Sequence, residues 1–534
     1  MTDYVWDAGG DGTSWNDDDN WGGSGHPNSN ADKATIGVGS ASISMNLAGG
    51  TGTIGELVLG NGFSGTVTQA YGFTIDDAGA QNGYMTMRGG TWDMNNANLV
   101  VDGVLTVQPN STAGSTNHSN FFARGGNLTV GSKIHCQGVW SSGDVDYAPE
   151  ANFDGGSSTI SCIALSIGTG ADVVMSSDVT TITGSSGGAA FRMDTQTAYN
   201  TYSNGTGTVK FTSASDQLLY SGGLSANDFT QFHHLILEKT SSTLQGLSTV
   251  GFHIKVGGDL TITSGILNTT TTTAVDHALT VTGQCAVAGT LTCNASTVSV
   301  GSGLTNTLGM LVQSGGTLTG GSGPHTYGTF NADASGTVNV TLTSDTTTIN
   351  GSYTDGIAFA MRSGVTFSAG GGDIHFTGSG NQYLYERNNT ARTLGDVTVN
   401  KSGGNFQWYN GGGAHYTMAS LTITAGTFAT NEITSGTSKD LTVQGQTYID
   451  TAGVLSCGAS TMSLGQTDLS PADSSWGLYV SGGILYGGTG THTISSFFIN
   501  GGSATLTSGD TTLNGFNTSS ASPFKAITGT FAQT

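Results

Sequence analysis

The feature of this 534-residue chain that most constrains its fold is a long segment that occurs three times. Its most regular phrase is rich in Asp and Thr and reads SDVTTITG at 177–184, SDTTTING at 344–351 and GDTTLNG at 509–515. The shared residues Asp178, Asp345 and Asp510 are separated by 167 and then by 165 residues. A period of this length, filled with short apolar and polar alternations, is typical of stacked or strung β units and not of one compact catalytic domain.

Further matches extend the repeat over most of the chain. The stretch QLLY at 217–220 returns as QYLY at 382–385, and TLTCNAST at 290–297 returns as VLSCGAST at 454–461. Matches in the same order over this length indicate duplication of a whole structural unit. The sequence therefore predicts an N-terminal cap or attachment module followed by three repeats, at 1–50, 51–207, 208–371 and 372–534.

Short stretches in which apolar and small polar residues alternate, such as LTVTG at 279–283, dominate the sequence. Period-2 alternation bounded by Gly, Asn, Asp and Ser is typical of half-buried strands and turns. The residues that favour helices, Glu, Lys and Arg, are scarce, so we predict an all-β fold. Two architectures fit this pattern: a β-solenoid, similar to a parallel β-helix, and a string of β-sandwich domains. Short strands and frequent Gly turns favour the solenoid.

The composition disfavours several classes of function. The net charge of −22, from 36 acidic and 14 basic residues, opposes binding to nucleic acid or to anionic membranes. No run of 18 apolar residues predicts a transmembrane helix, and the first residues lack the basic and apolar regions of a secretory signal. The five cysteines include no CxxC pair, so we expect small buried residues and not a zinc site.

The N-terminal stretch differs from the rest, because 4–21, YVWDAGGDGTSWNDDDNW, holds three of the seven Trp residues. It resembles the Trp- and Gly-rich opening of autotransporter-type and other secreted β-solenoid repeat proteins. Phrases such as LTITSG at 260–265 resemble Gly/Thr-rich β-repeat proteins of marine bacteriophage virions and of bacterial surface adhesins. This resemblance covers most of the chain as a pattern, and it implies an extended, non-enzymatic surface or virion protein.

Carboxylates gather beside these Trp residues, and two interpretations of them stay open. They are Asp7, Asp11, Asp17, Asp18 and Asp19. Calcium takes six to eight oxygen ligands, so the cluster is a candidate calcium site, although its spacing does not match an EF-hand loop. The alternative is a solvated acidic turn beside Trp residues that cap the first coil and hide its apolar edge.

No arrangement in the sequence points to catalysis. The repeated Asp178, Asp345 and Asp510 suit structural turns, because Asp caps its own backbone. His325 and His492 hold equivalent repeat positions and also suit turns. The five Glu residues are widely separated, and the nucleophile-elbow, Walker and HExxH motifs are missing. We therefore predict that the protein is not an enzyme, with no cofactor other than possible calcium.

One part of the third repeat is a candidate binding patch, because aromatic and basic residues gather where the second repeat has mostly small ones. They are Tyr383, Tyr385, Arg387, Arg392, Trp408, Tyr409, His415 and Tyr416. Exposed aromatic rings beside Arg are typical of surfaces that bind sugars or proteins. The alternative is local packing of the duplicated unit.

These observations together predict a structural virion protein of a bacteriophage, displayed on the surface as a capsid decoration or as a tail fibre. The expected partners are other virion proteins and a host surface glycan, and a homotrimer is expected because symmetry closes exposed edges. Two alternatives stay open. One is an extracellular or cell-surface adhesin or S-layer-like protein, and the other is a polysaccharide-degrading tailspike.

Overall fold

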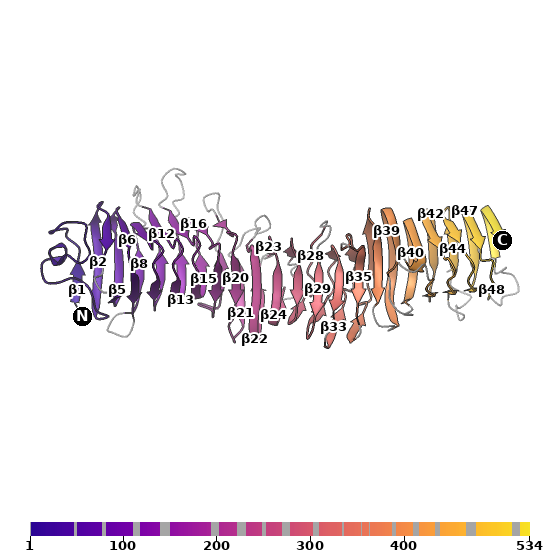
Figure 1. Cartoon of the computed structure of the whole chain (residues 1–534), viewed down its shortest axis with the longest axis horizontal. Coiled ribbons are helices and arrows are strands. Elements are labelled where there is room, and N and C mark those ends of the chain that lie inside the picture. The colour runs from indigo at the N-terminus through magenta and orange to yellow at the C-terminus, as the bar shows by residue number, and fades with distance from the viewer. Residues whose placement is uncertain are drawn as a thin grey trace. The chain divides into compact units, whose positions relative to one another are not determined.

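The structure is a computed structural model, and its strands stack in parallel coils (Figure 1). It describes residues 2–46, 51–76, 82–109, 118–138, 150–193, 202–221, 231–247, 253–269, 278–302, 309–333, 336–353, 355–362, 364–386, 391–409, 416–432, 438–465, 477–514 and 524–533. Every ladder between described strands is parallel, which confirms the predicted β-solenoid and does not favour the string of sandwiches. The described residues form no α-helix. Within that part of the chain, no helix has the length and apolar character needed to cross a membrane.

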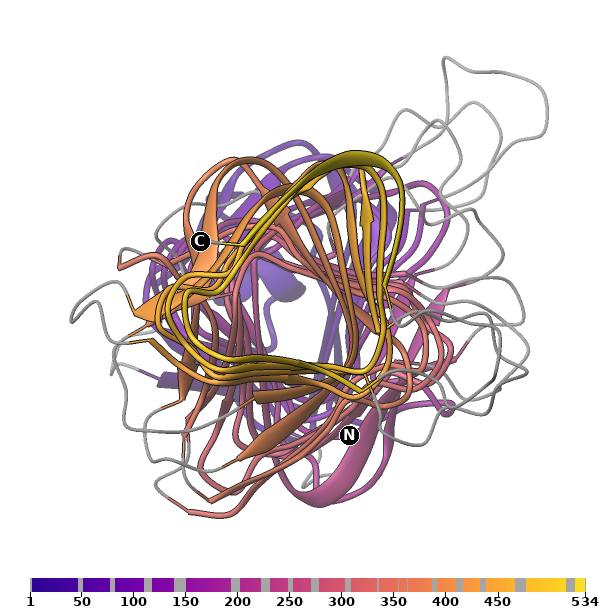
Figure 2. The same cartoon turned by 90° about the vertical axis from the view of Figure 1, so that its right-hand side faces the viewer.

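The chain divides into two units, and each is described by itself. Unit 1 consists of Met1–Gly258 and Thr263–His277, and unit 2 consists of Asp259–Ile262 and Ala278–Thr534. In both units, successive coils of the chain lie directly on one another, as the superposed coils in Figure 2 show. Strand β24 (Leu260–Asn268) contributes residues to both units.

Unit 1 has three parallel ladders, which are built up by successive coils. The first ladder starts with β1 (Thr2–Val5), which pairs with β2 (Asp32–Gly39). It continues through β5 (Glu56–Phe63), β8 (Met85–Met87), β11 (Leu105–Val107), the second halves of β13 (Leu128–Cys136) and β15 (Ile160–Ile167), β18 (Phe191–Met193) and β21 (Gln217–Ser221). The second contains β4 (Thr51–Ile54), β7 (Gly72–Ile75), β10 (Leu99–Val101), the first halves of β13 and β15, β17 (Val179–Ile182), β20 (Thr208–Phe211) and the start of β22 (His234–Leu247). The third contains β3 (Ile43–Met45), β6 (Thr66–Gln69), β9 (Gly90–Asp93), β12 (Ser119–Phe122), β14 (Ala151–Asp154), β16 (Ala171–Val174) and β19 (Tyr202–Ser203). Strand β23 (Ile254–Val256) also belongs to this unit.

Unit 2 repeats the same three-ladder plan. Its first ladder contains the start of β24, β26 (Cys285–Val287), β29 (Met310–Gln313), β32 (Phe330–Asp333), β35 (Ile357–Met361), β38 (Gln382–Glu386), the ends of β39 (Arg392–Trp408), β40 (Tyr416–Glu432) and β42 (Thr447–Ser456), β45 (Ile484–Tyr486), and the ends of β47 (Phe497–Leu506) and β49 (Phe524–Gln533). The second contains β25 (Leu279–Val281), β28 (Val298–Val300), β31 (His325–Tyr327), β34 (Thr347–Ile349), β37 (Asp373–Gly378), inner parts of β39 and β40, the start of β42, β44 (Leu478–Ser481), and the starts of β47 and β49. The remaining strands are β27 (Thr290–Thr292), β30 (Thr317–Thr319), β33 (Val338–Thr341), β36 (Val365–Ser368), β41 (Leu441–Val443), β43 (Met462–Leu464), β46 (His492–Ile494) and β48 (Thr511–Leu513).

The core of each unit consists of apolar side chains that stack in register from coil to coil. Alternation along each strand turns one residue inward and the next outward, so the sequence period of two becomes an apolar column. One column in unit 1 is formed by Leu57, Met85, Leu105, Ile134, Leu165, Phe191 and Leu219, all buried. All five cysteines are buried, as expected, and burial raises the pKa of the Cys162 and Cys293 thiols to about 12.

The repeated Asp residues lie in turns, which agrees with the sequence prediction. Asp178 and Asp345 precede β17 and β34, and Asp510 precedes β48. Just before each turn, a buried hydroxyl donates to a carbonyl of the neighbouring coil: Ser176 Oγ to Ser158 O at 2.5 Å, Thr343 Oγ1 to Gly323 O at 2.6 Å and Thr507 Oγ1 to Gly490 O at 2.5 Å. The same three hydroxyls accept from the backbone N–H of Asp178, Asp345 and Gly509, so the duplicated phrase encodes a fixed link between coils.

The expectation that His325 and His492 are turn residues is wrong. Both begin strands, both side chains are buried, and both stack on a Thr of the next coil, Thr347 or Thr511. In the first repeat, the residue that stacks on Thr180 is Ile160. The position therefore belongs to the core, where an apolar side chain and a His are both accommodated.

Candidate functional site: a basic groove in unit 1

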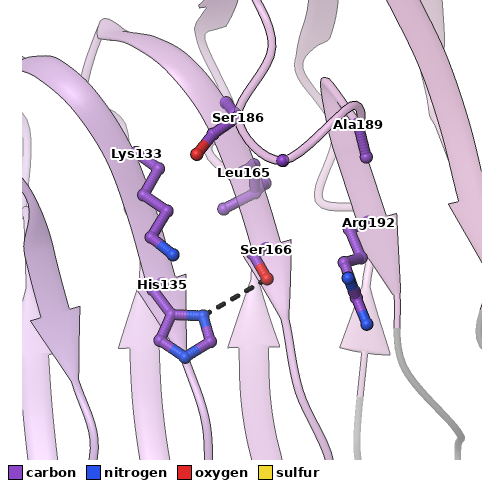
Figure 3. A pocket seen from close by; sticks show the side chains of 9 residues that line it. Lys133, His135, Leu165, Ser166, Ser186, Ala189 and Arg192 are labelled. Carbon is purple, nitrogen blue, oxygen red and sulfur yellow. Dashed lines mark hydrogen bonds between the residues drawn. The ribbon is translucent and has the colours of Figure 1, made fainter.

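The site that we consider in most detail is a groove on the outer face of the first ladder of unit 1. Lys133, His135, Ser166, Ser186 and Arg192 line it, and we call it the basic groove. Figure 3 shows Lys133 and His135 on one strand, Ser166 on the next strand and Arg192 on the strand after that. Its volume is about 230 Å³, which is below the roughly 300–1,000 Å³ of sites for drug-sized ligands.

The strand register brings these residues together. His135 on β13, Ser166 on β15 and Arg192 on β18 occupy the same position on three successive rungs. Rungs of a sheet are about 4.8 Å apart, so the three side chains form one outward column. Lys133 lies two residues before His135 and therefore points to the same side of the strand. An added Cβ at Gly131 would lie 2.2 Å from the Asp102 carbonyl oxygen, so glycine allows the close coil contact just before Lys133.

A tight turn forms another wall of the groove. The backbone of Ser186 donates to the Ala189 carbonyl at 2.9 Å, and Ala189 donates back at 3.3 Å. The two central residues, Gly187 and Gly188, have φ values of 60° and 86°. Positive φ at both central positions of a two-residue turn strongly favours glycine. The Gly-Gly pair in the sequence thus fixes the position of the Ser186 hydroxyl at the groove.

Hydrogen bonds and a ring contact orient two of the basic side chains. His135 contacts Ser166 Oγ through Nδ1 at 3.2 Å and Gln137 Oε1 through Nε2 at 3.1 Å. Because the Gln137 oxygen can only accept, Nε2 donates and Nδ1 of a neutral ring accepts from the serine. The Arg192 guanidinium lies over the Tyr220 ring, 4.7 Å from its centroid, and Tyr220 is the next rung of the column.

Lys133 differs from several other cations of this acidic chain. Four exposed or half-buried cations pair with carboxylates: Lys33 with Glu56, Arg124 with Asp93, Lys210 with Glu238, and Arg362 with Asp333. Among the described residues, none forms an ion pair with Lys133. The groove thus joins an ammonium and a guanidinium, which donate to an anion, with the Ser186 hydroxyl and the hydrogen-bonded pair of His135 and Ser166.

The predicted calcium ligands do not converge in the structure. The Asp11 carboxylate accepts from Thr13 N, Ser14 N and Asn20 Nδ2, and these hydrogen bonds lower its pKa. Asp17 caps the short 3-10 helix η1 (Asp18–Trp21), and Asp18 contacts His26 Nδ1 at 2.7 Å. No three His, Cys, Asp or Glu side chains of the described part of the chain come together as a metal-binding group. Asp7 accepts from Gly9 N, Asp19 lies in the first turn of η1, and calcium binding stays a prediction.

The three N-terminal Trp residues form a buried cluster against the first coils. Trp21 meets Trp6 and Trp15 edge to face, with ring centroids 5.0 and 4.8 Å apart. Trp15 also contacts Phe73 of β7, and the Trp21 indole donates to the Trp15 carbonyl at 2.7 Å. β1 pairs with β2 as the first rung. These contacts cover the apolar interior of the first coils, which is the position expected of a cap.

The predicted aromatic patch of the third repeat lies mostly inside the coils. Trp408 and Tyr416 stack 5.1 Å apart and are both buried, as are Tyr383 and Arg392. Arg392 donates to the carbonyls of Val365 and Arg362, and its Nε lies 3.7 Å from Glu386 Oε2. The expected exposure of these four residues is therefore wrong, because the strands turn them toward the core.

Two members of that patch remain partly accessible. Tyr385 and Tyr409 are half-buried and meet edge to face at 5.4 Å. Tyr409 also stacks on Tyr383 at 5.8 Å. Arg387 and His415 lie outside the described residues. A binding role for this patch stays a prediction that rests on Tyr385 and Tyr409.

Sequence reasoning missed the basic groove, because Lys133 and Arg192 are far apart in the chain and carry no motif. Only the coil length and register place them two rungs apart on the same face.

Comparison of the chain with protein family models, with curated proteins and with solved structures finds no match. The function of the basic groove is therefore inferred from its residues and their geometry.

Proposed function

We propose that this chain is a non-enzymatic structural protein of a bacteriophage particle, displayed on the capsid or tail surface as a decoration or fibre with an adhesive role. The observation that carries the proposal is the series of in-register ladders through each unit, lined by stacked apolar side chains. Such coils form a stiff scaffold whose outward columns repeat about every 4.8 Å.

The surface chemistry adds support. A net charge of −22 favours solubility and mutual repulsion between crowded copies, which suits a component displayed many times on a surface. The buried Trp cluster over the first coils covers an apolar end that would otherwise aggregate. We further propose a homotrimer as the assembled form, because symmetric association covers remaining edges. Sedimentation of the purified chain tests that assembly directly.

Mass spectrometry of gradient-purified particles from the source tests the proposed location. The peptide signals of this chain are compared with those of a major capsid protein, which gives the copy number per particle. A stoichiometric copy number supports a capsid decoration, and a few copies per particle support a tail fibre. Absence from particles together with presence in the cell envelope would overturn the virion proposal and leave the cell-surface adhesin.

A further inference from the structure

We propose that the basic groove binds an acidic polysaccharide through the carboxylate or sulfate groups of its sugars. The inference names a ligand class for the proposed adhesive role. It rests on that proposed function in one respect, which is that the chain binds a ligand outside the protein. It starts from a contrast: the chain has 36 acidic residues and only 14 Lys and Arg residues, yet two of these cations and one His line one groove.

The groove offers two cationic donors to an acidic ligand. Lys133 supplies a mobile ammonium, and among the described residues it has no ion-pair partner to lose on binding. Arg192 is exposed, and its contact with the Tyr220 ring orients the planar guanidinium that suits bidentate binding of a carboxylate or sulfate. Charge-assisted hydrogen bonds of this kind are roughly twice as strong as neutral ones.

The neutral groups of the groove match a sugar more closely than a bare ion. Ser186 presents a hydroxyl, and His135 is hydrogen-bonded to Ser166 and to Gln137. Hydroxyl, imidazole and amide groups both donate to and accept from sugar hydroxyls.

The size and the charge of the surroundings restrict the ligand class. A volume of about 230 Å³ accommodates a small part of a ligand, so a polymer would place one residue there and gain affinity by multivalent display. A nucleic acid is disfavoured, because its dense phosphates would meet a protein of net charge −22 and only a few cations. A polysaccharide with one acidic group per sugar has a lower charge density than a nucleic acid. It also carries several hydroxyl groups on each sugar, whereas a phosphate backbone carries few.

Binding of the purified full chain to three defined polymers tests the inference. The probes are polygalacturonate for carboxylates, dextran sulfate for sulfates and neutral dextran as the uncharged reference. The variants are Lys133→Met and Arg192→Gln, and Arg362→Gln is the matched control, because it removes one cation from an ion pair in unit 2. Circular dichroism confirms that each variant keeps the β-fold.

We expect binding to at least one acidic polymer and none to neutral dextran. Lys133→Met and Arg192→Gln should each weaken that binding about tenfold or more, as loss of a charge-assisted hydrogen bond does, whereas Arg362→Gln should not. The preferred polymer identifies the anionic group. Binding to neither acidic polymer, or equal binding by all folded variants, would overturn the site.

The outcomes separate this site from the proposed function. Particle proteomics can place the chain in the cell envelope without affecting the groove, and a groove that fails to bind leaves a structural virion protein intact. If the polymer is bound at the groove and shortened during incubation, the site is supported and the non-enzymatic part of the proposed function is overturned.

Discussion

The buried ammonium of Lys239 donates a hydrogen bond of 2.7 Å to Gln217 Oε1. The next repeat contains the same link, in which Lys401 donates to Gln382 Oε1 at 2.9 Å. Both Gln side chains also donate through Nε2 to backbone carbonyls of the preceding coil, those of Gly184 and Gly351. A Lys–Gln bridge across coils is thus duplicated with the segment that contains it, and it satisfies polar groups inside the solenoid.

Removal of the acceptor in this bridge should destabilise unit 2. In Gln382→Leu, the buried Lys401 ammonium loses the only acceptor that the described residues offer it, so we expect a loss of about 2–3 kcal/mol in the free energy of unfolding. Urea unfolding followed by circular dichroism measures this loss. The double variant Gln382→Leu/Lys401→Met should recover most of it, because no charge then remains buried without a partner. A double variant no more stable than Gln382→Leu would contradict this account.

The same lysines should make the protein more stable at alkaline pH. Burial lowers the pKa of Lys239 and of Lys401 from 10.5 to about 8, since it disfavours the charged form. Between these values the unfolded chain binds protons that the folded chain does not, so stability rises with pH from about 8 to about 10.5. We expect the melting temperature of the wild type to increase relative to Lys239→Met/Lys401→Met over this range. A pH-independent difference would show that the two ammonium groups are not the cause.

Buried His residues should make the protein sensitive to acid. Burial lowers the pKa of His325 from 6.5 to about 4, and it also lowers the pKa of His492. The unfolded chain therefore takes up protons first, and stability present above pH 6.5 is lost as the pH falls toward 4. His492→Ile, which introduces the side chain that Ile160 supplies in the first repeat, should reduce this loss in melts between pH 7 and pH 4.5. His26→Gln is the control, because His26 lies in the N-terminal segment and contacts the exposed Asp18. Parallel pH profiles of wild type and His492→Ile would refute the assignment.

The fold could be predicted from the sequence, because an inward column needs alternation of apolar and polar residues, and that alternation is visible in the repeats. The orientation of individual side chains could not. In β38, four of the five residues from Gln382 to Glu386 are buried, so alternation does not separate the two faces there, and Tyr383 points inward against expectation. His325 has the polarity of a turn residue but occupies a core position beside Tyr327.

The candidate site illustrates the same limit. The calcium and aromatic hypotheses relied on residues that are close in sequence, whereas the basic groove depends on residues that come from separate coils. Lys133 aligns with Ala164, and His135 aligns with Ser166 and then with Arg192. Coil lengths vary along the chain, so this register follows from the packing of whole coils and not from any local motif.

The hydroxyl that precedes each repeated Asp gives a test of how the duplicated phrase stabilises the stack. Thr343 is fully buried, donates to the Gly323 carbonyl and accepts from Asp345 N, so Thr343→Val should cost about 1–3 kcal/mol by leaving both groups unpaired. Thr343→Ser is the matched control, because Ser176 makes the same two hydrogen bonds in the first repeat. We expect the serine variant to stay within about 1 kcal/mol of the wild type, the scale of one deleted methyl group. In urea unfolding, a Thr343→Val variant as stable as the wild type beside a destabilised Thr343→Ser variant would mean that methyl packing, and not the hydroxyl link, holds the coils together at this turn.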